Sequence, residues 1–562
     1  MKADLWKIGV AHDRRPEGNF RHSQVIGTYG PGALVDLVQG SAIISGLAWW
    51  ARGPEISEDR LTAMISRQEG YENIVLFGPP VSTRDLDDRD RKWIKAFRFP
   101  EWFVCQNEDC WADGDYPARA DGARPRRLLR INQLDGSGHK CKGKGATSRV
   151  QAIRFVRACR AGHVDDIDWI RLVHTVHTNC KRNILWFDEV GTGGDLKDLR
   201  VTCSGCGDNI RMSVAAQYFR EKEPTLGYCT GRRPWLGGNS HAGCDEPMRL
   251  LLCSASHAYF PVPASVIHIP DPDADIRNKV SGVYELIKNV KNPAQIGMLR
   301  DMQDPVRIGL EGVSDDAAYG EVDRRKESRP IARKKVKEAE VEVLQSCPPS
   351  LATDRPNGRF YARTLPLPAN RPKVMEHIDK VVLMHRLTEV RAFVGFTRFE
   401  AKTTDVDGEL DIGAEVARPD APMTWLPAVE NHGEGFFFSI KEQALAKWED
   451  QPAVDKRGKL FRKGFDIWQA QREERKRQKP DFATARFVLL HSLSHLLISA
   501  VSLECGYAAS SGARTALFQR PCLLRTCPGP RAGRLRPIPG RRLLPRLPAH
   551  LGAILRTDEH VP

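Results

Sequence analysis

Cysteines concentrated in one stretch of this chain are the feature that most constrains its fold. Residues 101–262 contain ten of the 14 cysteines, and two of them, Cys203 and Cys206, stand in the sequence VTCSGCGDN. Two thiols three positions apart, followed by glycine, form the tight knuckle that places both sulfurs on one tetrahedral metal ion. The stretch is therefore predicted to fold around metal ions in place of a large apolar core.

Two further ligands are needed to complete a site at this knuckle. Cys229 and Cys244 follow in the glycine-rich sequences GYCTG and AGCDE. We expect them to complete a four-cysteine zinc site with Cys203 and Cys206. The alternative is a set of buried free thiols, which rarely occupy loops as polar and glycine-rich as these.

A looser group of cysteines precedes the knuckle. Cys105, Cys110 and Cys141 are predicted to form a second zinc site, with Cys159 as the fourth ligand. The C-x4-C spacing of the first pair is acceptable for zinc but less specific than C-x2-C. His163, in the sequence CRAGH, is an alternative to Cys159.

His174, His177 and Cys180 form a third pattern, H-x2-H-x2-C. On a helix the two histidines would share a face, so a ligand role stays open, although a structural histidine is the more common outcome. At the two predicted sites every ligand comes from the protein and no position is open to water. Such closed sites are structural, so we expect Zn²⁺ as a structural cofactor.

An acidic cluster offers a catalytic alternative. Asp165, Asp166 and Asp168 follow His163 in GHVDDIDW, and acid clusters can hold the metal ion of a nuclease. Aspartates that open a helix are more simply N-terminal caps, which is the favoured interpretation. No other catalytic constellation stands out, and the chain is predicted not to be an enzyme, with a metal-dependent nuclease as the alternative.

The predicted fold class is α+β and multi-domain, with Cys-rich zinc-ribbon-like modules inserted in the N-terminal half and a mixed α/β C-terminal domain. The expected parts are an N-terminal domain, the cysteine-rich zinc-binding region, a helical and charged linker region, an incomplete C-terminal α+β domain and a disordered tail: 1–100, 101–262, 263–350, 351–511 and 512–562.

Finer expectations follow from local pattern. We expect an amphipathic helix over Ile276–Gln303 and a linker or solvated helix over Asp315–Glu342. Val381–Phe399 is rich in apolar and β-branched residues, Trp425–Ile440 reads as two strands around a glycine-bounded turn, and Phe487–Leu503 reads as a buried helix.

Much of the positive charge lies in the tail. The whole chain carries 85 − 71 = +14, of which residues 512–562 supply 10 − 2 = +8, all of the positive charge from arginine. Arginine without lysine, together with 8 prolines, is typical of an out-of-frame reading of GC-rich DNA, so a frame slip near Ser510 is predicted. The alternative is a native disordered tail that binds nucleic acid.

The sequence also predicts that the protein is cytoplasmic. Met1–Gly18 has no apolar core of a signal peptide, and Phe487–Leu503 is too short and too polar to span a membrane. Without an export signal the thiols are expected to stay reduced, which favours metal binding over disulfides.

The motifs taken together resemble a known family. They occur in this order: SQVIGTYGPGALVD, FPEWFVC, RFVRACRAGHVDDIDW, VTCSGC, GRRPWLGG, HRLTEVRAFVGFTRF, WLPAVENHGEGFF and HSLSHLLISAVSLECGYAASS. This set, covering about residues 20–510, is similar to DrmB, a component of the bacterial DISARM anti-phage defence system. The family continues beyond the LECGY block with segments that this sequence lacks, at the point where the frame slip is predicted.

The resemblance implies a role rather than a reaction. It implies a zinc-associated domain of unknown function and an accessory subunit without ATPase activity. The implied partner is a helicase-like subunit, DrmA, and DNA would be engaged through the complex. It also implies that Cys203, Cys206, Cys229 and Cys244 belong to one zinc-binding block of the family, and Cys105 and Cys110 to another. A zinc scaffold without nucleic-acid contact is the plainer alternative.

Overall fold

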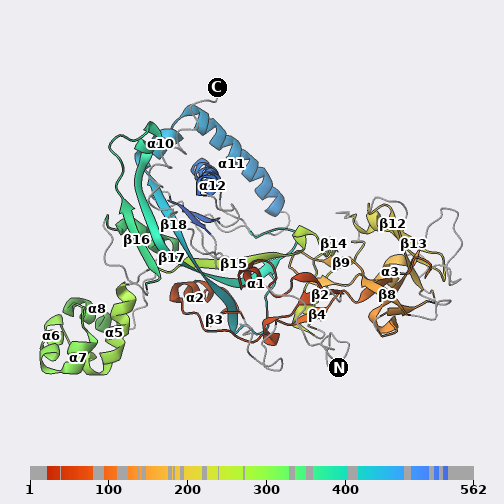
Figure 1. Cartoon of the computed structure of the whole chain (residues 1–562), viewed down its shortest axis with the longest axis horizontal. Helices are drawn as coiled ribbons and strands as arrows, with labels where there is room; N and C mark the ends of the chain where they lie inside the picture. The colour runs from red at the N-terminus through yellow and green to blue at the C-terminus, as the bar shows by residue number, and fades with distance from the viewer. Residues whose placement is uncertain are drawn as a thin grey trace. The chain divides into compact units, whose positions relative to one another are not determined.

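Figure 1 shows the computed structural model of the chain, whose described residues lie between 22 and 528. They cover the ranges 22–37, 40–79, 94–110, 125–136, 138–141, 147–174, 180, 184–189, 195–217, 224–237, 240–269, 272–327, 336–349, 358–402, 416–473, 482–505, 512–517 and 523–528.

These residues belong to two compact units, each assembled from segments distant in sequence. The first comprises Met1–Val266, Val390–Asp405 and Leu410–Asn431, and the second comprises Ile267–Glu389, Val406–Glu409 and His432–Pro562. Helices and several sheets occur together, and cysteine-rich clusters lie in the N-terminal half, so the expected α+β class is confirmed. The linear domain boundaries stay a prediction.

The first unit begins with a small antiparallel sheet of order β1-β2-β4. Its hairpin follows the turn at Gly30-Pro31-Gly32, and Gly32 has a φ of +81°, where glycine is favoured. A Cβ on Gly32 would also lie 2.3 Å from the Phe396 ring, so the turn packs directly on that side chain. The elements of this part are α1 (His22–Gly27), β1 (Leu34–Leu37), β2 (Gly40–Ile44), η1 (Leu47–Trp49), α2 (Asp59–Ile65), β3 (Val75–Phe77) and β4 (Ala96–Arg98).

The cysteine-rich region forms two further sheets. A seven-stranded sheet runs in the order β13-β12-β11-β6-β5-β8-β7, and a three-stranded sheet runs β10-β9-β14. The strands are β5 (Trp102–Cys105), β6 (Arg126–Arg130), β7 (Gly138–Lys140), β8 (Thr147–Ala152), β9 (Phe155–Ala158), β10 (Val164–Asp165), β11 (Leu185–Glu189), β12 (Leu199–Cys203), β13 (Asn209–Arg211) and β14 (Arg249–Leu252). Short helices connect them: η3 (Ile131–Gln133), α3 (Trp169–Val173), α4 (Met212–Ala215), η4 (Pro234–Leu236) and η5 (Ser256–Ala258).

The core of this region is built from aromatic and aliphatic side chains together with cysteines. Trp169 is fully buried, and the same cluster contains the buried thiols of Cys159, Cys203 and Cys229. Sulfur atoms therefore lie inside the packed interior, where a thiolate without a partner is costly.

One buried arginine connects three distant backbone segments of the first unit. Arg398 is 1 % exposed, and its guanidinium donates to the carbonyl oxygens of Gly162 (2.9 Å), Ala258 (2.5 Å) and Gly32 (2.7 Å). Its Cζ also lies 5.0 Å from the Phe396 ring centroid. Burial lowers the pKa of Arg398 to about 10, so the side chain remains charged at neutral pH.

The second unit contains a block of four helices with its own apolar core (Figure 1). The helices are α5 (Pro272–Ile287), α6 (Pro293–Met302), α7 (Asp304–Gly309) and α8 (Asp315–Lys326). The single helix expected over Ile276–Gln303 is two helices, because Asn292 caps α6 and Pro293 occupies its first position. The linker expected after Asp315 begins as α8, whose Ala318 and Val322 are fully buried.

A further seven-stranded sheet contains the longest strands of the described chain. It runs β15-β17-β18-β20-β19, with β16 paired to β17 and β3 to β18. Its remaining strands are β15 (Phe260–Ile267), β16 (Phe360–Leu365), β17 (Ile378–Thr397), β18 (Trp425–Ile440), β19 (Gly512–Leu517) and β20 (Leu523–Pro528). β17 contains most of the apolar, β-branched stretch Val381–Phe399, whereas the turn expected inside Trp425–Ile440 is wrong, because β18 continues through its glycines.

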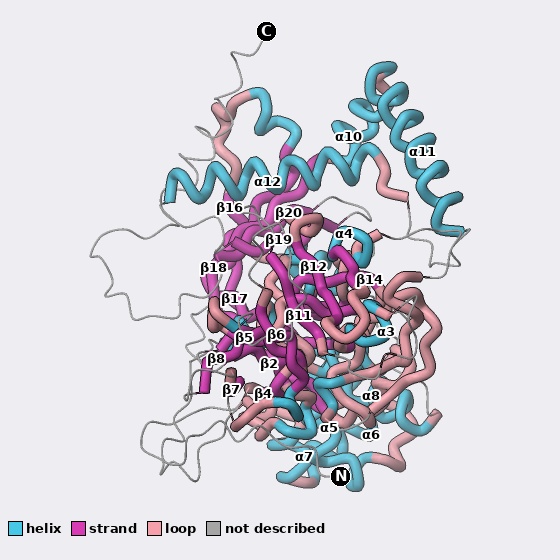
Figure 2. Tube along the Cα trace, turned by 90° about the vertical axis from the view of Figure 1, so that its right-hand side faces the viewer, coloured by secondary structure: helices cyan, strands magenta, loops and turns pink. Residues whose placement is uncertain are grey.

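Helices accompany this sheet: α9 (Val336–Ser346), η6 (Lys373–His377), α10 (Glu442–Glu449), α11 (Pro452–Glu473) and α12 (Ala485–Cys505). α12 lies across the strands in Figure 2 and packs Leu497 against Phe436 and Phe438. It is not wholly buried as expected, because Leu496 is 65 % exposed. No described helix is long and apolar enough to cross a membrane.

The tail contains two described strands. β19 and β20 form a hairpin that pairs Ala513 with Cys527, and β20 continues onto β18 by pairing Thr526 with Phe436. The expectation of a disordered tail therefore does not describe these twelve positions. The rest of the tail lies outside the described residues, and the frame slip, a statement about the gene, stays a prediction.

We expect Arg398→Met to destabilise the first unit strongly. The change leaves three buried carbonyl oxygens without a donor, and each such group costs about 1–3 kcal/mol. The free energy of unfolding, measured by denaturant titration, should fall by at least about 3 kcal/mol. Arg391→Met, at a partly exposed position of β17, the strand that ends directly before Arg398, is the control. Equal losses in the two variants would contradict the role assigned to Arg398.

Candidate metal centres

Among the described residues of the first unit lie three clusters of potential metal ligands, each made of three cysteines and one histidine. Within each cluster the four ligand atoms lie within 4.8 Å of one another. The first cluster is Cys105, Cys110, His139 and Cys141; the second is Cys159, His163, Cys229 and Cys244; the third is His174, Cys180, Cys203 and Cys206.

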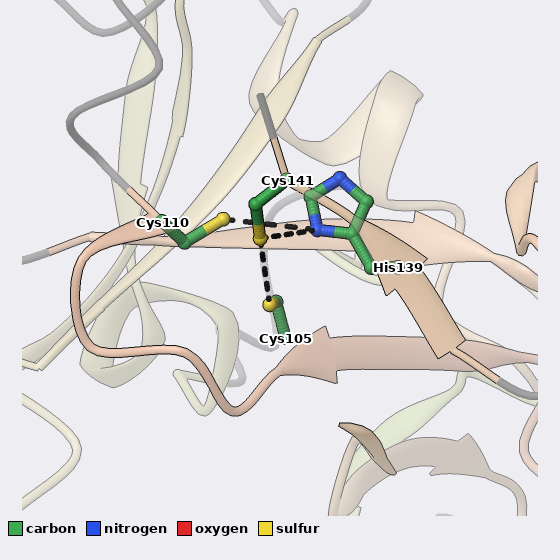
Figure 3. Close-up of side chains that lie close together, drawn as sticks. All are labelled: Cys105, Cys110, His139 and Cys141. Carbon is green, nitrogen blue, oxygen red and sulfur yellow. Dashed lines mark hydrogen bonds between the residues drawn. The ribbon is translucent and has the colours of Figure 1, made fainter. Parts of the chain in front are cut away.

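Strand ends of the seven-stranded sheet position the first cluster (Figure 3). Cys105 ends β5, and Cys110 follows in the turn after it. His139 lies on β7, and Cys141 follows that strand. The Sγ atoms of Cys105 and Cys141 are 3.7 Å apart, and His139 Nδ1 lies 3.5 Å from Cys141 Sγ and 3.8 Å from Cys110 Sγ.

The second cluster joins the β9–β10 hairpin to two loops far along the chain. Cys159 follows β9, and the backbone N–H of Cys159 donates to the carbonyl of His163 across the hairpin. His163 Nδ1 lies 3.5 Å from Cys159 Sγ and 3.6 Å from Cys229 Sγ. Cys244 completes the set.

The third cluster contains the C-x2-C knuckle. Cys203 ends β12, and the N–H of Gly207 donates to its carbonyl at 2.9 Å, closing the turn that also carries Cys206. Gly207 has a φ of +82°, which explains the glycine directly after the knuckle. His174 stands at the C-terminal end of α3, and Cys180 Sγ lies 3.7 Å from Cys203 Sγ.

Each cluster also has a backbone N–H directed at one sulfur, two residues after the cysteine. The donors are Asn107 to Cys105 (3.4 Å), Gly231 to Cys229 (3.2 Å) and Gly205 to Cys203 (3.3 Å). Hydrogen bonds to the charged form of a group favour that form. The backbone at all three clusters is thus arranged to stabilise a thiolate.

The spacing of the ligand atoms fits a tetrahedral zinc ion. Zn–S bonds of about 2.3 Å and Zn–N bonds of about 2.0–2.1 Å give tetrahedral edges of about 3.8 Å between sulfurs and about 3.6 Å between sulfur and nitrogen. The sulfur–sulfur contacts of 3.7 Å and sulfur–nitrogen contacts of 3.5–3.8 Å match these edges. Thiolate and imidazole are donors that zinc prefers, and Zn²⁺ bound here would supply cross-links between segments of the chain.

The electrostatics of the clusters also favour a bound metal ion. The hydrogen bond with Cys110 lowers the pKa of Cys105 to about 4, and the same contact raises the pKa of Cys110. In the second cluster the contact with Cys159 lowers the pKa of Cys229 to about 4. Without a cation one thiolate thus keeps its neighbour protonated, whereas a coordinated metal ion deprotonates every thiol bound to it.

The eight cysteines expected as ligands all lie in these clusters, but the expected grouping into two sites is wrong. Cys203 and Cys206 lie with His174 and Cys180, not with Cys229 and Cys244. Cys159 lies with Cys229 and Cys244, not with the first cluster. The alternative in which His163 takes the place of Cys159 is also wrong, because both belong to the second cluster. Whether the clusters hold zinc stays a prediction.

Histidines were the ligands that the sequence signalled least clearly. His139 precedes Cys141 by two positions, and this H-x-C spacing does not match the C-x2-C pattern of a zinc knuckle. His174 and Cys180 belong to the H-x2-H-x2-C pattern, for which a structural role was favoured, and they join the third cluster. The remaining member of that pattern, His177, lies outside the described residues.

One residue of the acidic sequence GHVDDIDW confirms the capping interpretation. Asp168 is the N-cap of α3, and its Oδ1 accepts a hydrogen bond from the backbone N–H of Arg171 at 3.1 Å. Its carboxylate is thereby directed at a helix end, where a negative charge is stabilised.

The two other aspartates belong to an ion-pair network. Asp165 contacts Arg157 at 2.8 Å and Arg232 at 2.5 Å, and Asp166 accepts from the N–H of Glu101 at 3.0 Å. Burial raises the pKa of Asp166 to about 7, against the opposing effect of Arg232. Each acid of the proposed nuclease site therefore has a structural partner, and His163 belongs to the second cluster.

Comparison with known proteins gives two matches, the first to a protein family. Residues 21–260 match a family described as a domain of unknown function (DUF8724), a span that includes all three clusters. The chain is also 27% identical over 443 residues to the DISARM protein DrmB of Bacillus paralicheniformis (strain ATCC 9945a / NCIMB 11709 / CD-2), covering 76% of this chain and 72% of that protein. The resemblance to DrmB expected from the sequence motifs is confirmed.

We expect the purified protein to contain about three zinc ions per chain, one for each closed cluster. The grouping has a sharper test in paired substitutions. Cys203→Ser with Cys206→Ser should remove one ion, because both residues belong to the third cluster. Cys203→Ser with Cys229→Ser should remove two, because these residues belong to different clusters. Metal content is measured by elemental analysis of folded protein.

Cys206→His is the control, because it keeps a ligand in place and should keep all three ions. Loss of a single ion in the Cys203 and Cys229 pair would restore the two-site grouping. A metal-free wild-type protein that still unfolds cooperatively would contradict the structural role of the clusters.

Proposed function

We propose that this chain is a non-catalytic accessory subunit of a DISARM-type anti-phage defence complex in the bacterial cytoplasm. The observation that carries this proposal is the similarity to a DISARM protein, DrmB, over 76% of the chain. The metal clusters support it, because closed Cys3His sites stabilise a scaffold and leave no position for substrate or water.

In this proposal the partner is a DrmA-like helicase subunit, and the chain helps that subunit to hold DNA. A scaffold of this kind needs exposed surface and charge rather than reactive groups. The ion pairs and the cap that engage Asp165, Asp166 and Asp168 support a structural use of these acids.

Helix α11 supplies a surface suited to such contacts. Pro452–Glu473 contains six basic and three acidic residues, and most of its described side chains are exposed. Leu460 and Ile467 are 55 % and 56 % exposed, so apolar and basic groups alternate on the helix. Lysine and arginine on an exposed helix bind phosphates without reading sequence, and such binding weakens as salt rises.

The test is a comparison of each subunit with the mixture. We expect this chain alone to hydrolyse no ATP and to cleave no DNA with Mg²⁺. The mixture with its helicase-like partner should bind DNA more tightly than the partner alone. Arg457→Ala, Lys459→Ala and Lys463→Ala together should reduce the slope of log affinity against log salt by about 2–3, because each lost phosphate contact removes about 0.9.

A triple variant in the helical block, Lys288→Ala, Lys291→Ala and Arg307→Ala, is matched in charge and should leave the slope unchanged. ATP turnover by this chain alone, or Mg²⁺-dependent cleavage lost in Asp165→Ala, would overturn the non-catalytic assignment. DNA binding by the mixture that equals that of the helicase-like subunit would overturn the proposed role in DNA engagement.

A further inference from the structure

A pocket of about 660 Å³ opens on the first unit beside the three-stranded sheet. Its floor is apolar and includes Phe155, Leu226, Met248 and Leu250. Cavities of about 300–1,000 Å³ with an apolar floor and a few polar groups are typical of small-molecule sites. No residue of the three metal clusters lines the pocket, so it is a separate feature of the unit.

The rim of the pocket carries positive charge and an aromatic platform. Arg154, Arg249, His257 and Phe399 all line it, and the lining contains no acidic residue. The His257 and Phe399 rings are stacked, with centroids 5.8 Å apart and an angle of 28° between their planes. Arg249 Cζ lies 5.9 Å from the Phe399 centroid, so cation and ring lie close together.

The backbone at Phe399 is unusual. Its φ is +67°, and Asn73 is the only other non-glycine residue with a positive φ among those that the structure describes. This conformation is strained for a bulky residue and persists only when the surroundings enforce it. Here the N–H of Phe399 donates to the carbonyl of His257 at 2.8 Å, and the neighbouring Arg398 is held by three carbonyls. The strained position holds the aromatic ring at the pocket rim.

Arg154 can exchange its ion-pair partner, Glu189, for an anionic group of a ligand. Its guanidinium contacts Glu189 at 3.3 Å, and both side chains are exposed, by 54% and 42%. Exposed ion pairs contribute little to stability, so a ligand anion can replace the carboxylate at little cost. Glu189 also contacts Arg126 at 2.8 Å, which keeps the carboxylate paired after the exchange.

We propose that this pocket binds a nucleotide, with the base on the apolar floor beside Phe399 and the phosphate on Arg154 and Arg249. A flat aromatic base matches the floor and the stacking platform, and a phosphate matches the cationic rim. A purely apolar ligand would leave the arginines without a role, and a simple anion would leave the floor exposed to water. The nucleotide could be free or part of a single strand.

The site would stand even if the chain had no helicase-like partner, so its test is separate from that of the proposed function. The probes are 2-aminopurine riboside 5′-monophosphate and a single-stranded DNA hexamer with one 2-aminopurine. Stacking quenches the fluorescence of this base, so we expect saturable quenching by the full chain with at least one probe. Binding of the monophosphate identifies a free nucleotide as the ligand, and binding of the hexamer alone identifies a strand.

Substitutions in the pocket test whether the fluorescence quenching arises there. Phe399→Leu removes the ring and should weaken binding about tenfold, the usual effect of losing one base–aromatic contact. Leu196→Trp fills the cavity with a larger side chain and should weaken binding by excluding the base. Arg154→Ala should also weaken it. Glu189→Gln should strengthen it, because the competing carboxylate is lost. Ile170→Trp, at an exposed position on α3 outside the pocket, is the control for the added ring.

The following results would contradict the proposed nucleotide site. Absence of quenching with both probes by folded, metal-loaded protein would overturn the proposal. Quenching that Leu196→Trp and Phe399→Leu leave unchanged would place the ligand elsewhere and overturn it as well. A Glu189→Gln variant that binds more weakly would contradict the exchange of partners at Arg154.

Discussion

The convergence of three thiols and one imidazole within 4.8 Å, repeated three times, is the constraint on which the first unit depends. Buried sulfurs at this spacing repel one another once ionised. A divalent cation at the centre removes the conflict. The second cluster joins Cys159 to Cys244 across a loop of more than eighty residues, and closing so long a loop restricts the unfolded chain substantially.

The clusters and the buried arginine belong to one electrostatic system. A zinc ion with three thiolates and a neutral imidazole has a net charge of −1. Arg398 donates to the carbonyl of Gly162, directly before His163 of the second cluster, and the Cys159 thiolate favours the charged form of Arg398. A buried guanidinium that otherwise has backbone carbonyls as partners would thus have the metal centre as a counter-charge. This would explain how a buried cation can lie in the unit although its printed hydrogen bonds, within the described residues, go to carbonyl oxygens and not to a carboxylate.

The sequence identifies the cysteine ligands but not which of them share one metal site, and the reason is geometric. Spacing in the chain identifies a knuckle such as Cys203 and Cys206, because both residues belong to one turn. It does not show which distant segment completes the tetrahedron, since that depends on sheet order. α3 packs against β12 and brings His174 to the knuckle, whereas Cys229 meets the β9–β10 hairpin. The same limit applies to β18, where local glycines suggested a turn and long-range pairing with β3 and β20 extended the strand.

The strands that carry the candidate nucleotide pocket show why metal cross-links matter to a protein that is proposed to do no chemistry. Its lining residues Phe155, Leu226 and Met248 each lie within four residues of a ligand of the second cluster. The loops around residues 225–248 contain no long strand, and their described backbone hydrogen bonds are short-range or isolated, such as Cys229 N–H to Glu246 and Met248 N–H to Gly227. A cluster that fixes Cys229 and Cys244 also fixes the walls between them. A metal ion bound at the second cluster would therefore fix the shape of the pocket as well as stabilise the fold.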